Sequence, residues 1–244
     1  MNLEGKNIIL TGGSLGIGKE TAKSLINKGA NVLVTGRSEE RLIRTIKYTK
    51  SKIIEFDIGD IENISLNAKK CIEILDNRVD VLINNAGIGV RKSIEELNIN
   101  DFLDVFNVNV FGLSLFTKEI IPLMKQQKRG TIINIGSTAS LKGYKNGSIY
   151  ASSKFAVRCL TQCWQAELRP HNIRVCQINP SEVTTAFGNP KRIERDEVDK
   201  KLTPNQGCVY GSVCSDKSRE CEDLPKYKEI TNDKGHLTTC VKQV

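Results

Sequence analysis

Apolar and polar positions alternate with two different periods along the chain up to about residue 204. Short runs rich in β-branched residues predict strands, and they lie at 7–10, 31–34, 52–56, 79–83, 131–135 and 173–178. Between them, apolar residues recur every three or four positions and predict helices over 17–28, 38–48, 61–76, 100–127 and 150–169. Because these strands are almost continuously apolar, we expect an α/β fold in which helices cover both faces of a doubly wound parallel sheet.

The last forty residues depart from this pattern. Residues 205–244 show neither period, and they contain four cysteines whose spacing matches no zinc site with paired ligands: Cys208, Cys214, Cys221 and Cys240. The sequence therefore predicts a catalytic domain over 1–204 and an atypical cysteine-rich tail over 205–244. Disorder is one interpretation of the tail and a shifted reading frame is another; either leaves a sheet edge unpaired. The other cysteines lie in apolar segments and are expected to be buried: Cys71, Cys159, Cys163 and Cys176.

The formal net charge is +8, and all of the excess falls upstream of the tail. It indicates either a solvated basic surface or a patch for an anionic partner. No run combines basic and aromatic residues, so nucleic-acid binding is not expected. The apolar runs are far shorter than the roughly 20 residues that a membrane span needs. The start, MNLEGKNIILTGG, lacks a signal peptide, which favours the cytoplasm.

A glycine turn follows the first predicted strand and opens the first helix. In TGGSLGIG the glycines allow a tight turn and close approach of a pyrophosphate to the helix N-terminus. The strand before and the helix after this turn are the context that a dinucleotide site requires. The predicted cofactor-binding residues of the turn are Gly12, Ser14, Gly16, Ile17 and Gly18.

The next strand ends predict how the adenosine and its ribose are bound. VLVTGRSEE has no acid to accept from a ribose 2′-hydroxyl, and Arg37 can pair with a 2′-phosphate, so NADP(H) is predicted over NAD(H). Asp57 is placed to accept from the adenine amino group, and Asp60 to cap the following helix. The small residues of INNAG let the backbone run close to the cofactor, with Asn84, Ala86 and Gly87 as candidate contacts. Asn84 can equally be a residue that only ties the sheet together.

A candidate catalytic set follows the fifth strand. Tyr150 and Lys154 are four residues apart and share one face of a helix, so the lysine charge is expected to lower the pKa of the phenol. Such a tyrosine can exchange a proton with a carbonyl or alcohol oxygen near neutral pH. Ser137 can hydrogen-bond the same oxygen. The alternative is a partly exposed helix start with a serine turn.

Together, TGGSLGIG (11–18), NNAG (84–87), Ser137 and YASSK (150–154) resemble the short-chain dehydrogenase/reductase family over about residues 5–190. The resemblance implies a Rossmann-type fold and assigns Asn109, in NVNVFG, to a water-mediated proton relay toward Lys154. It also implies that INPSEVTTAF binds the nicotinamide through Pro180, Val183 and Thr185, although Ser181 stands where the family has glycine. Both Tyr150 and Lys154 are expected to contact the cofactor as well as the substrate.

Within that family the pattern is similar to 3-oxoacyl-[acyl-carrier-protein] reductases of fatty acid biosynthesis. This implies reduction of 3-oxoacyl thioesters, with an acidic acyl carrier protein docked beside the active-site mouth at Lys128, Arg129 and Arg169. These cations can equally be stabilised by the negative ends of helix dipoles at helix C-termini. The alternatives are a small-molecule or steroid-like alcohol dehydrogenase and, because of the tail, an inactive nucleotide-binding member. The resemblance also implies a homodimer or homotetramer paired through 100–127 and 150–169.

Overall fold

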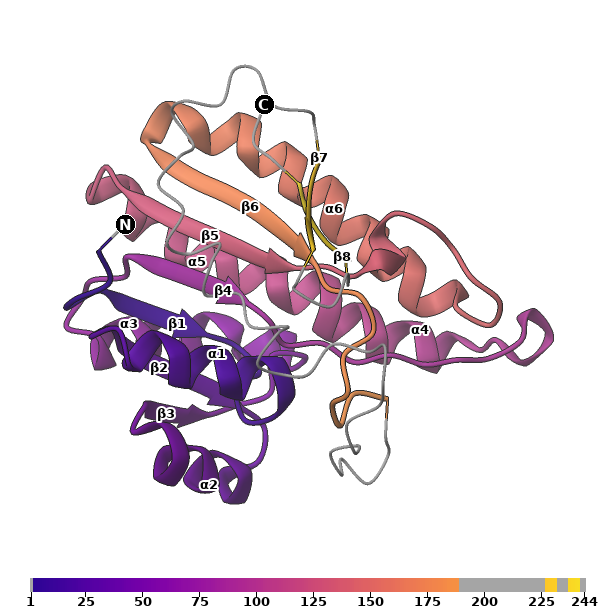
Figure 1. The fold of residues 1–244 in the computed structure, drawn as a ribbon, viewed down its shortest axis with the longest axis horizontal. Coiled ribbons are helices and arrows are strands. Elements are labelled where there is room, and N and C mark those ends of the chain that lie inside the picture. Colours follow the sequence, from indigo (N-terminus) through magenta and orange to yellow (C-terminus); the bar gives the residue numbers. More distant parts are fainter. Residues whose placement is uncertain (1, 189–226, 232–236, 242–244) are drawn as a thin grey trace.

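A twisted β-sheet forms the centre of the protein (Figure 1). The computed structural model describes residues 2–188, 227–231 and 237–241. The strands are β1 (Asn7–Leu10), β2 (Asn31–Gly36), β3 (Lys52–Glu55), β4 (Val81–Asn84), β5 (Gly130–Ile135), β6 (Ile173–Asn179), β7 (Tyr227–Thr231) and β8 (Leu237–Val241). They pair in the order β3-β2-β1-β4-β5-β6-β8-β7, and the six strands from β3 to β6 are parallel. The strand order reverses between β1 and β4, which places the ligand crevice of such a fold at their carboxyl ends.

Helices cover both faces of this sheet (Figure 1). They are α1 (Gly16–Ile26), α2 (Glu39–Thr49), α3 (Ile64–Ile74), α4 (Ile99–Phe106), α5 (Leu113–Gln126) and α6 (Ser148–Leu168). Short 3-10 turns lie at Ile61–Asn63, Ile94–Glu96, Thr138–Ser140 and Arg169–His171. Side chains of α1 and α2 share one apolar cluster with the sheet, and those of α3, α5 and the end of α6 share the other. Among the described residues, no helix is both long and apolar enough to cross a membrane.

Strand β1 shows why the doubly wound arrangement forms. Ile8 and Leu10 join the cluster on the α1 side, Ile9 joins the opposite cluster, and all three are fully buried. Each such side chain contributes about 1.5–3 kcal/mol when it leaves water. A strand with apolar residues on both faces can satisfy them only between two helical layers. The α/β parallel-sheet prediction is therefore confirmed.

The far edge of the sheet differs from the expectation for the tail. Residues 205–226 of the tail lie outside the described residues. Two later segments of the tail, β7 and β8, form strands. β8 pairs antiparallel with β6, with Ile178 opposite Cys240, and β7 pairs antiparallel with β8. The edge of β6 that we expected to be unpaired is therefore covered, and the tail supplies the covering strand.

The predicted helix over 100–127 is divided into three parts. α4 passes into a wider π-helical segment, Asn107–Gly112, before α5 begins. Gly112 lies so close to the carbonyl oxygen of Ile58 that a Cβ at this position would collide with it. A local widening of a helix of this kind is frequent at functional sites. A sequence period of three and four residues does not distinguish the two helix types, so the interruption was not predicted.

Two smaller predictions were wrong. Cys159 and Cys163 are exposed on α6, whereas Cys71 and Cys176 are buried as expected. Cys159 and Cys163 are one turn apart, on a face of α6 that points away from the buried residues of that helix. Asp60 does not cap the following helix: its side chain accepts from the Asn63 amide, and no cap bond is formed.

Candidate active site

A cavity of about 990 Å³ opens at the carboxyl ends of the parallel strands. It is lined by the glycine turn before α1, the ends of β2 to β6, the first turns of α6 and the segment that follows β6. The predicted residues that line it are Gly12, Ser14, Gly16, Ile17, Gly18, Arg37, Asp57, Ala86, Gly87, Ser137, Tyr150, Lys154, Pro180, Val183 and Thr185. Asn84 and Asn109 do not line it. The fold thus gathers residues from distant parts of the sequence around one space.

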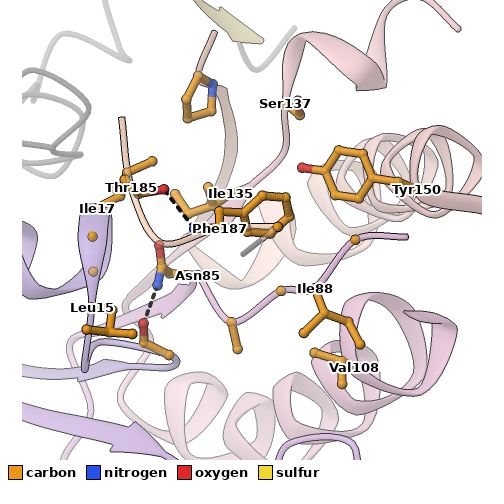
Figure 2. A pocket seen from close by; sticks show the side chains of 18 of the residues that line it. Leu15, Ile17, Asn85, Ile88, Val108, Ile135, Ser137, Tyr150, Thr185 and Phe187 are labelled. Carbon is orange, nitrogen blue, oxygen red and sulfur yellow. Dashed lines mark hydrogen bonds between the residues drawn. The ribbon is translucent and has the colours of Figure 1, made fainter. Parts of the chain in front are cut away.

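Two glycines of the turn, Gly12 and Gly18, have no room for a side chain. Gly12 has φ +64°, and a Cβ there would lie 2.6 Å from the Ala86 Cα. At Gly18 a Cβ would lie 2.6 Å from the Gly12 carbonyl oxygen, so the turn is closely packed against itself. Asn85, which was not predicted, donates from its side chain to the carbonyl oxygen of Gly12 (2.8 Å) and lines the cavity (Figure 2).

The N-terminus of α1 faces the same cavity. Its N-cap residue is Leu15, whose side chain makes no cap hydrogen bond, and the first turn contains no acid. Backbone N–H groups and the positive end of the helix dipole are therefore presented without an intramolecular anion. A helix start of this kind, beside closely packed glycines, fits the pyrophosphate of a dinucleotide.

The ends of β2 and β3 place an arginine and an aspartate beside each other. Arg37 Nη1 lies 3.7 Å from Asp57 Oδ2, with both side chains about half exposed. The Asp57 carboxylate also accepts from the backbone N–H of Gly59 (2.8 Å). Arg41, in the first turns of α2, lines the same part of the cavity and was not predicted. One turn separates it from Arg37, a spacing visible in the sequence, so two cations border this end.

Tyr150 and Ser137 face each other across the other end of the cavity (Figure 2). Ser137 lies two residues after the end of β5 and caps a 3-10 turn, where its hydroxyl accepts from the backbone N–H of Ala139 (3.1 Å). Tyr150 lies in the first turn of α6, and its ring packs at 5.4 Å from that of Phe187. Burial raises the pKa of Tyr150 to about 12, and the Ser137 hydrogen bond opposes this rise.

Lys154 is buried on the same helix, with 4% of its surface exposed. Its ammonium donates to the carbonyl oxygen of Ile135 (2.7 Å) and lies 5.8 Å from the centre of the Tyr150 ring. Burial lowers the pKa of Lys154 to about 8, so the side chain still carries its charge at neutral pH. The expected lowering of the Tyr150 pKa by Lys154 is not found in the chain alone: burial of the phenol is the largest effect, and the two lowering effects come from Ser137 and Arg91.

Asn109 lies in the π-helical segment and is fully buried beneath the cavity. Its amide donates to the Ile88 carbonyl (2.9 Å) and the Ser153 hydroxyl (3.0 Å), and its oxygen accepts from the Ile88 N–H (2.9 Å). Both ends of the side chain therefore have protein partners. The side chain fixes the loop after β4 near Lys154.

Asn84 has the second of its two predicted roles. The side chain is 2% exposed, and its amide donates to Thr117 and Asn134 (2.9 Å each). It ties β4 to α5 and β5 and does not line the cavity. Its neighbour Asn85 contacts the glycine turn instead, because successive residues at a strand end point to opposite faces.

The segment after β6 closes the cavity against α1. A Cβ on Gly16, whose φ is +53°, would lie 2.9 Å from Thr185 Cγ2. The Thr185 hydroxyl accepts from the N–H of Phe187 (3.2 Å), which directs that ring toward Tyr150 (Figure 2). Ser181, the residue that departs from the family pattern, lines the cavity with Pro180 on one side and Val183 beyond.

The basic residues expected beside the mouth lie elsewhere. Lys128 and Arg129 immediately precede β5, and Arg169 follows the last residue of α6. Tyr150 is at the opposite end of that helix, and 21 residues of α helix span about 30 Å. Within one chain these three cations therefore do not border the cavity.

Comparison with known proteins gives this arrangement a family. A family model described as short chain dehydrogenase matches residues 6–196. The chain is 32% identical over 194 residues to dehydrogenase/reductase SDR family member 7B of Xenopus laevis, covering 75% of this chain and 60% of that protein. It is also 32% identical over 196 residues to an NADP-dependent 3-hydroxy acid dehydrogenase of Schizosaccharomyces pombe, covering 76% and 74%. The crystal structure of 3-ketoacyl-(acyl-carrier-protein) reductase from Brucella melitensis, complexed with NADH, is similar with a TM-score of 0.78 and 27% identity, covering 88% of this chain and 93% of that one.

Proposed function

The chain belongs to the short-chain dehydrogenase family, and from that premise we propose that it is an NADP(H)-dependent oxidoreductase acting on a carbonyl or secondary alcohol. The supporting observation is that Ser137, Tyr150 and Lys154 line the same cavity as the glycine turn. That cavity joins a site for a dinucleotide to a buried phenol and a hydroxyl. A binding protein without catalysis has no need for the second part.

When bound, the nicotinamide supplies or accepts the hydride. Ser137 and Tyr150 hold the substrate oxygen, and Tyr150 gives it a proton during reduction or takes one during oxidation. The ammonium of Lys154, fixed by Ile135, lies close enough to favour the phenolate once the proton has left.

The preference for NADP(H) is supported by the two cations at the adenosine end, Arg37 and Arg41. A 2′-phosphate there would accept charge-assisted hydrogen bonds from guanidinium groups. Replacing Arg37 by Gln should weaken NADPH binding about 10- to 100-fold and leave NADH almost unchanged. Titrations of thermal stability with each nucleotide measure this, and equal losses for both nucleotides would contradict the assignment.

The proposed substrate is a 3-oxoacyl compound. Sequence resemblance favours the thioester form, and the names of the Brucella and Schizosaccharomyces proteins both describe an oxygen at carbon 3. NADPH oxidation with an acetoacetyl thioester and with acetoacetate tests the class. Turnover of neither, with turnover of cyclic or steroid-like ketones, would favour the general alcohol dehydrogenase. NADPH binding without any turnover would favour the inactive member.

A carrier-protein partner and self-association belong to the same proposal. An acyl carrier protein at Lys128, Arg129 and Arg169 would have to deliver its acyl arm from the far end of α6, so Arg129→Glu should not affect small thioesters.

Self-association is supported by exposed apolar side chains on the predicted pairing helices, including Leu103 on α4 and Phe155 on α6. Light scattering after size-exclusion chromatography measures it, and a monomer would remove this part.

A further inference from the structure

The loop after β4 passes directly along the catalytic tyrosine. A Cβ on Gly89 would lie 3.1 Å from Tyr150 Cδ2 and 3.2 Å from the Phe187 ring. This glycine therefore lets the backbone run against both rings. Arg91 is two residues further along and lines the cavity. The position of its backbone is thus fixed close to the reacting end of the site.

A second loop joins this one and supplies a surface for the arginine. The N–H of Lys92 donates to the carbonyl of Asn146 (3.2 Å), and the N–H of Gly147 donates to that of Tyr144 (3.0 Å). A Cβ on Gly147 would lie 2.5 Å from Tyr144 Cζ, so the tyrosine ring lies flat over this turn. Because Gly147 immediately precedes α6, the ring is held at the end of the helix that also carries Tyr150.

Arg91 is placed over that ring. Its guanidinium carbon lies 5.7 Å from the centre of Tyr144, within the range of a cation–π interaction. Lys142, on the same loop as Tyr144, is a second cation lining this end. Among the described residues, no carboxylate forms an ion pair with either cation. The charge of Arg91 also acts on the active site, since it lowers the pKa of Tyr150 against the larger effect of burial.

This arrangement has a chemical consequence for a 3-oxoacyl substrate. In the free acid, one methylene separates the reacting carbonyl from a carboxylate, so a group that binds the carboxylate must adjoin Tyr150. A planar guanidinium binds a carboxylate through two parallel hydrogen bonds. A thioester has no charge at that position. Arg91 and Lys142, the cations of the two loops, would therefore attract the free acid more strongly than the thioester.

We infer that Arg91, supported by Tyr144, binds the carboxylate of the substrate, and that the preferred substrates are free 3-oxo acids and the corresponding 3-hydroxy acids. The inference rests on the proposed function and selects one chemical form within it. In the reductive direction, carbon 3 accepts the hydride and its oxygen accepts the proton from Tyr150. The carboxylate stays ionised and bound throughout, so Arg91 positions the substrate and exchanges no proton.

The test compares acetoacetate with methyl acetoacetate, which differs by loss of the charge, in the full-length chain with NADPH. The wild type should have the higher kcat/KM for the acid. Arg91→Gln should lower kcat/KM for the acid about 10- to 100-fold, mainly through KM, and change that for the ester less than about twofold. Arg91→Lys should give an intermediate value. Arg44→Gln, which removes an exposed arginine of α2 that does not line the cavity, is the matched control and should change neither.

Several outcomes would overturn the inference. One is a wild type that prefers the ester; another is an Arg91→Gln variant that loses both substrates equally. Turnover of the acetoacetyl thioester without turnover of acetoacetate would reject the inference and leave the proposed function standing. Failure of all three substrates would reject the inference together with the proposed 3-oxoacyl substrate class, and turnover of other ketones would then decide whether the oxidoreductase function stands. Calorimetric binding of 3-hydroxybutyrate to the NADPH complex gives a readout without turnover, and unchanged affinity in Arg91→Gln would reject carboxylate binding directly.

Discussion

The two halves of the sheet, β1 to β3 and β4 to β6, border the cavity with different kinds of groups. In the half formed by β1 to β3, the buried strand positions are almost all apolar, and the cavity is bordered by glycines and a helix start. In the half formed by β4 to β6, strand positions beneath the active site are occupied by buried amides. We therefore propose that the first half recognises a ligand mainly through its backbone, with the side chains of Arg37 and Arg41 at the adenosine end, and that the second half holds the reactive side chains.

The buried amides form one continuous chain of hydrogen bonds. It runs from Asn84 to Asn134 (2.9 Å), to Thr161 (2.9 Å), to Gln177 (3.1 Å), to Asn179 (2.6 Å) and from there to the backbone N–H of Ser137 (3.2 Å). It crosses three strands and α6 and ends at Ser137, which we propose to be catalytic. Two atoms of this network, Oδ1 of Asn84 and Nδ2 of Asn179, are buried and have no hydrogen-bond partner among the described residues. The remaining bonds hold the amides in one arrangement, and losing a member would leave further buried polar groups without a partner.

The difference implies that each half tolerates different changes. Backbone recognition depends on space, so added atoms should do the most harm near the glycine turn. Positioned side chains depend on partners, so removed atoms should do the most harm in the catalytic half. Substitutions can test this separation, because nucleotide affinity and turnover are measured independently.

The largest effect is expected for Tyr150→Phe. Removing the proton donor should lower kcat about 10³-fold or more, while the NADPH-induced rise in thermal stability stays the same. The matched control is Tyr144→Phe, which keeps an aromatic ring over Gly147 and should retain most of the activity. Loss of NADPH binding in Tyr150→Phe would show that the two halves are not separable.

Gly12→Ala is expected to have the next largest effect, and it should act on the other half. The new Cβ would approach the Ala86 backbone at 2.6 Å, so NADPH affinity should fall at least about tenfold. Gly5→Ala is the control, since Gly5 has the same φ of +64° but open space around it. That variant should lose about 1–2 kcal/mol of stability and no affinity. Equal effects on affinity would mean that strain, and not the collision, is responsible.

Gln177→Leu tests the buried network. It removes the partner of Thr161 and of Asn179, so stability should fall by about 1–3 kcal/mol and kcat should fall with it. Gln165→Leu is the control: its amide donates to the Val175 carbonyl, outside the network. We expect a similar loss of stability from the control without the loss in kcat. A fall in kcat of the same size in both variants would remove the positioning role.

The last prediction concerns the pH dependence of stability and needs no turnover to be measured. The pKa of Lys154 is lowered from 10.5 to about 8 by burial, so the folded chain releases this proton before the unfolded chain does. The free energy of unfolding of the wild type, relative to Lys154→Met, should therefore increase from about pH 8 to 10.5, by at most about 1.4 kcal/mol per pH unit. A flat difference for Lys154→Met would contradict the burial.

The same contrast explains what the sequence could predict. Parallel strands buried on both faces have continuous apolar runs, so all six were located to within about two residues. The glycine turn was recognisable because a backbone site depends on a local pattern. β7 and β8, YKEIT and LTTCV, contain no such run; β8 forms by pairing with β6, and β7 by pairing with β8.

Site residues divide in a similar way. Tyr150, Lys154 and Ser137 belong to a recognisable pattern, and they line the cavity. Arg91 was not identified, because its position depends on two loops that meet only in the fold. Asn84 and Asn109 were candidates for the site, but in the fold their side-chain amides donate to protein partners. Asn84 donates to Thr117 and Asn134, and Asn109 donates to Ile88 and Ser153.

The pairing of β8 with β6 has a consequence for the order of events during synthesis. β6 leaves the ribosome well before β8, because residues 180–236 lie between these two strands in the sequence. Domains fold as units, starting from the N-terminal side during synthesis. During that interval the edge of β6 has free backbone groups, and a nascent chain with an open strand edge can pair with another. A ribosome-bound chain that ends before residue 237 should therefore depend more strongly on chaperones than the complete one.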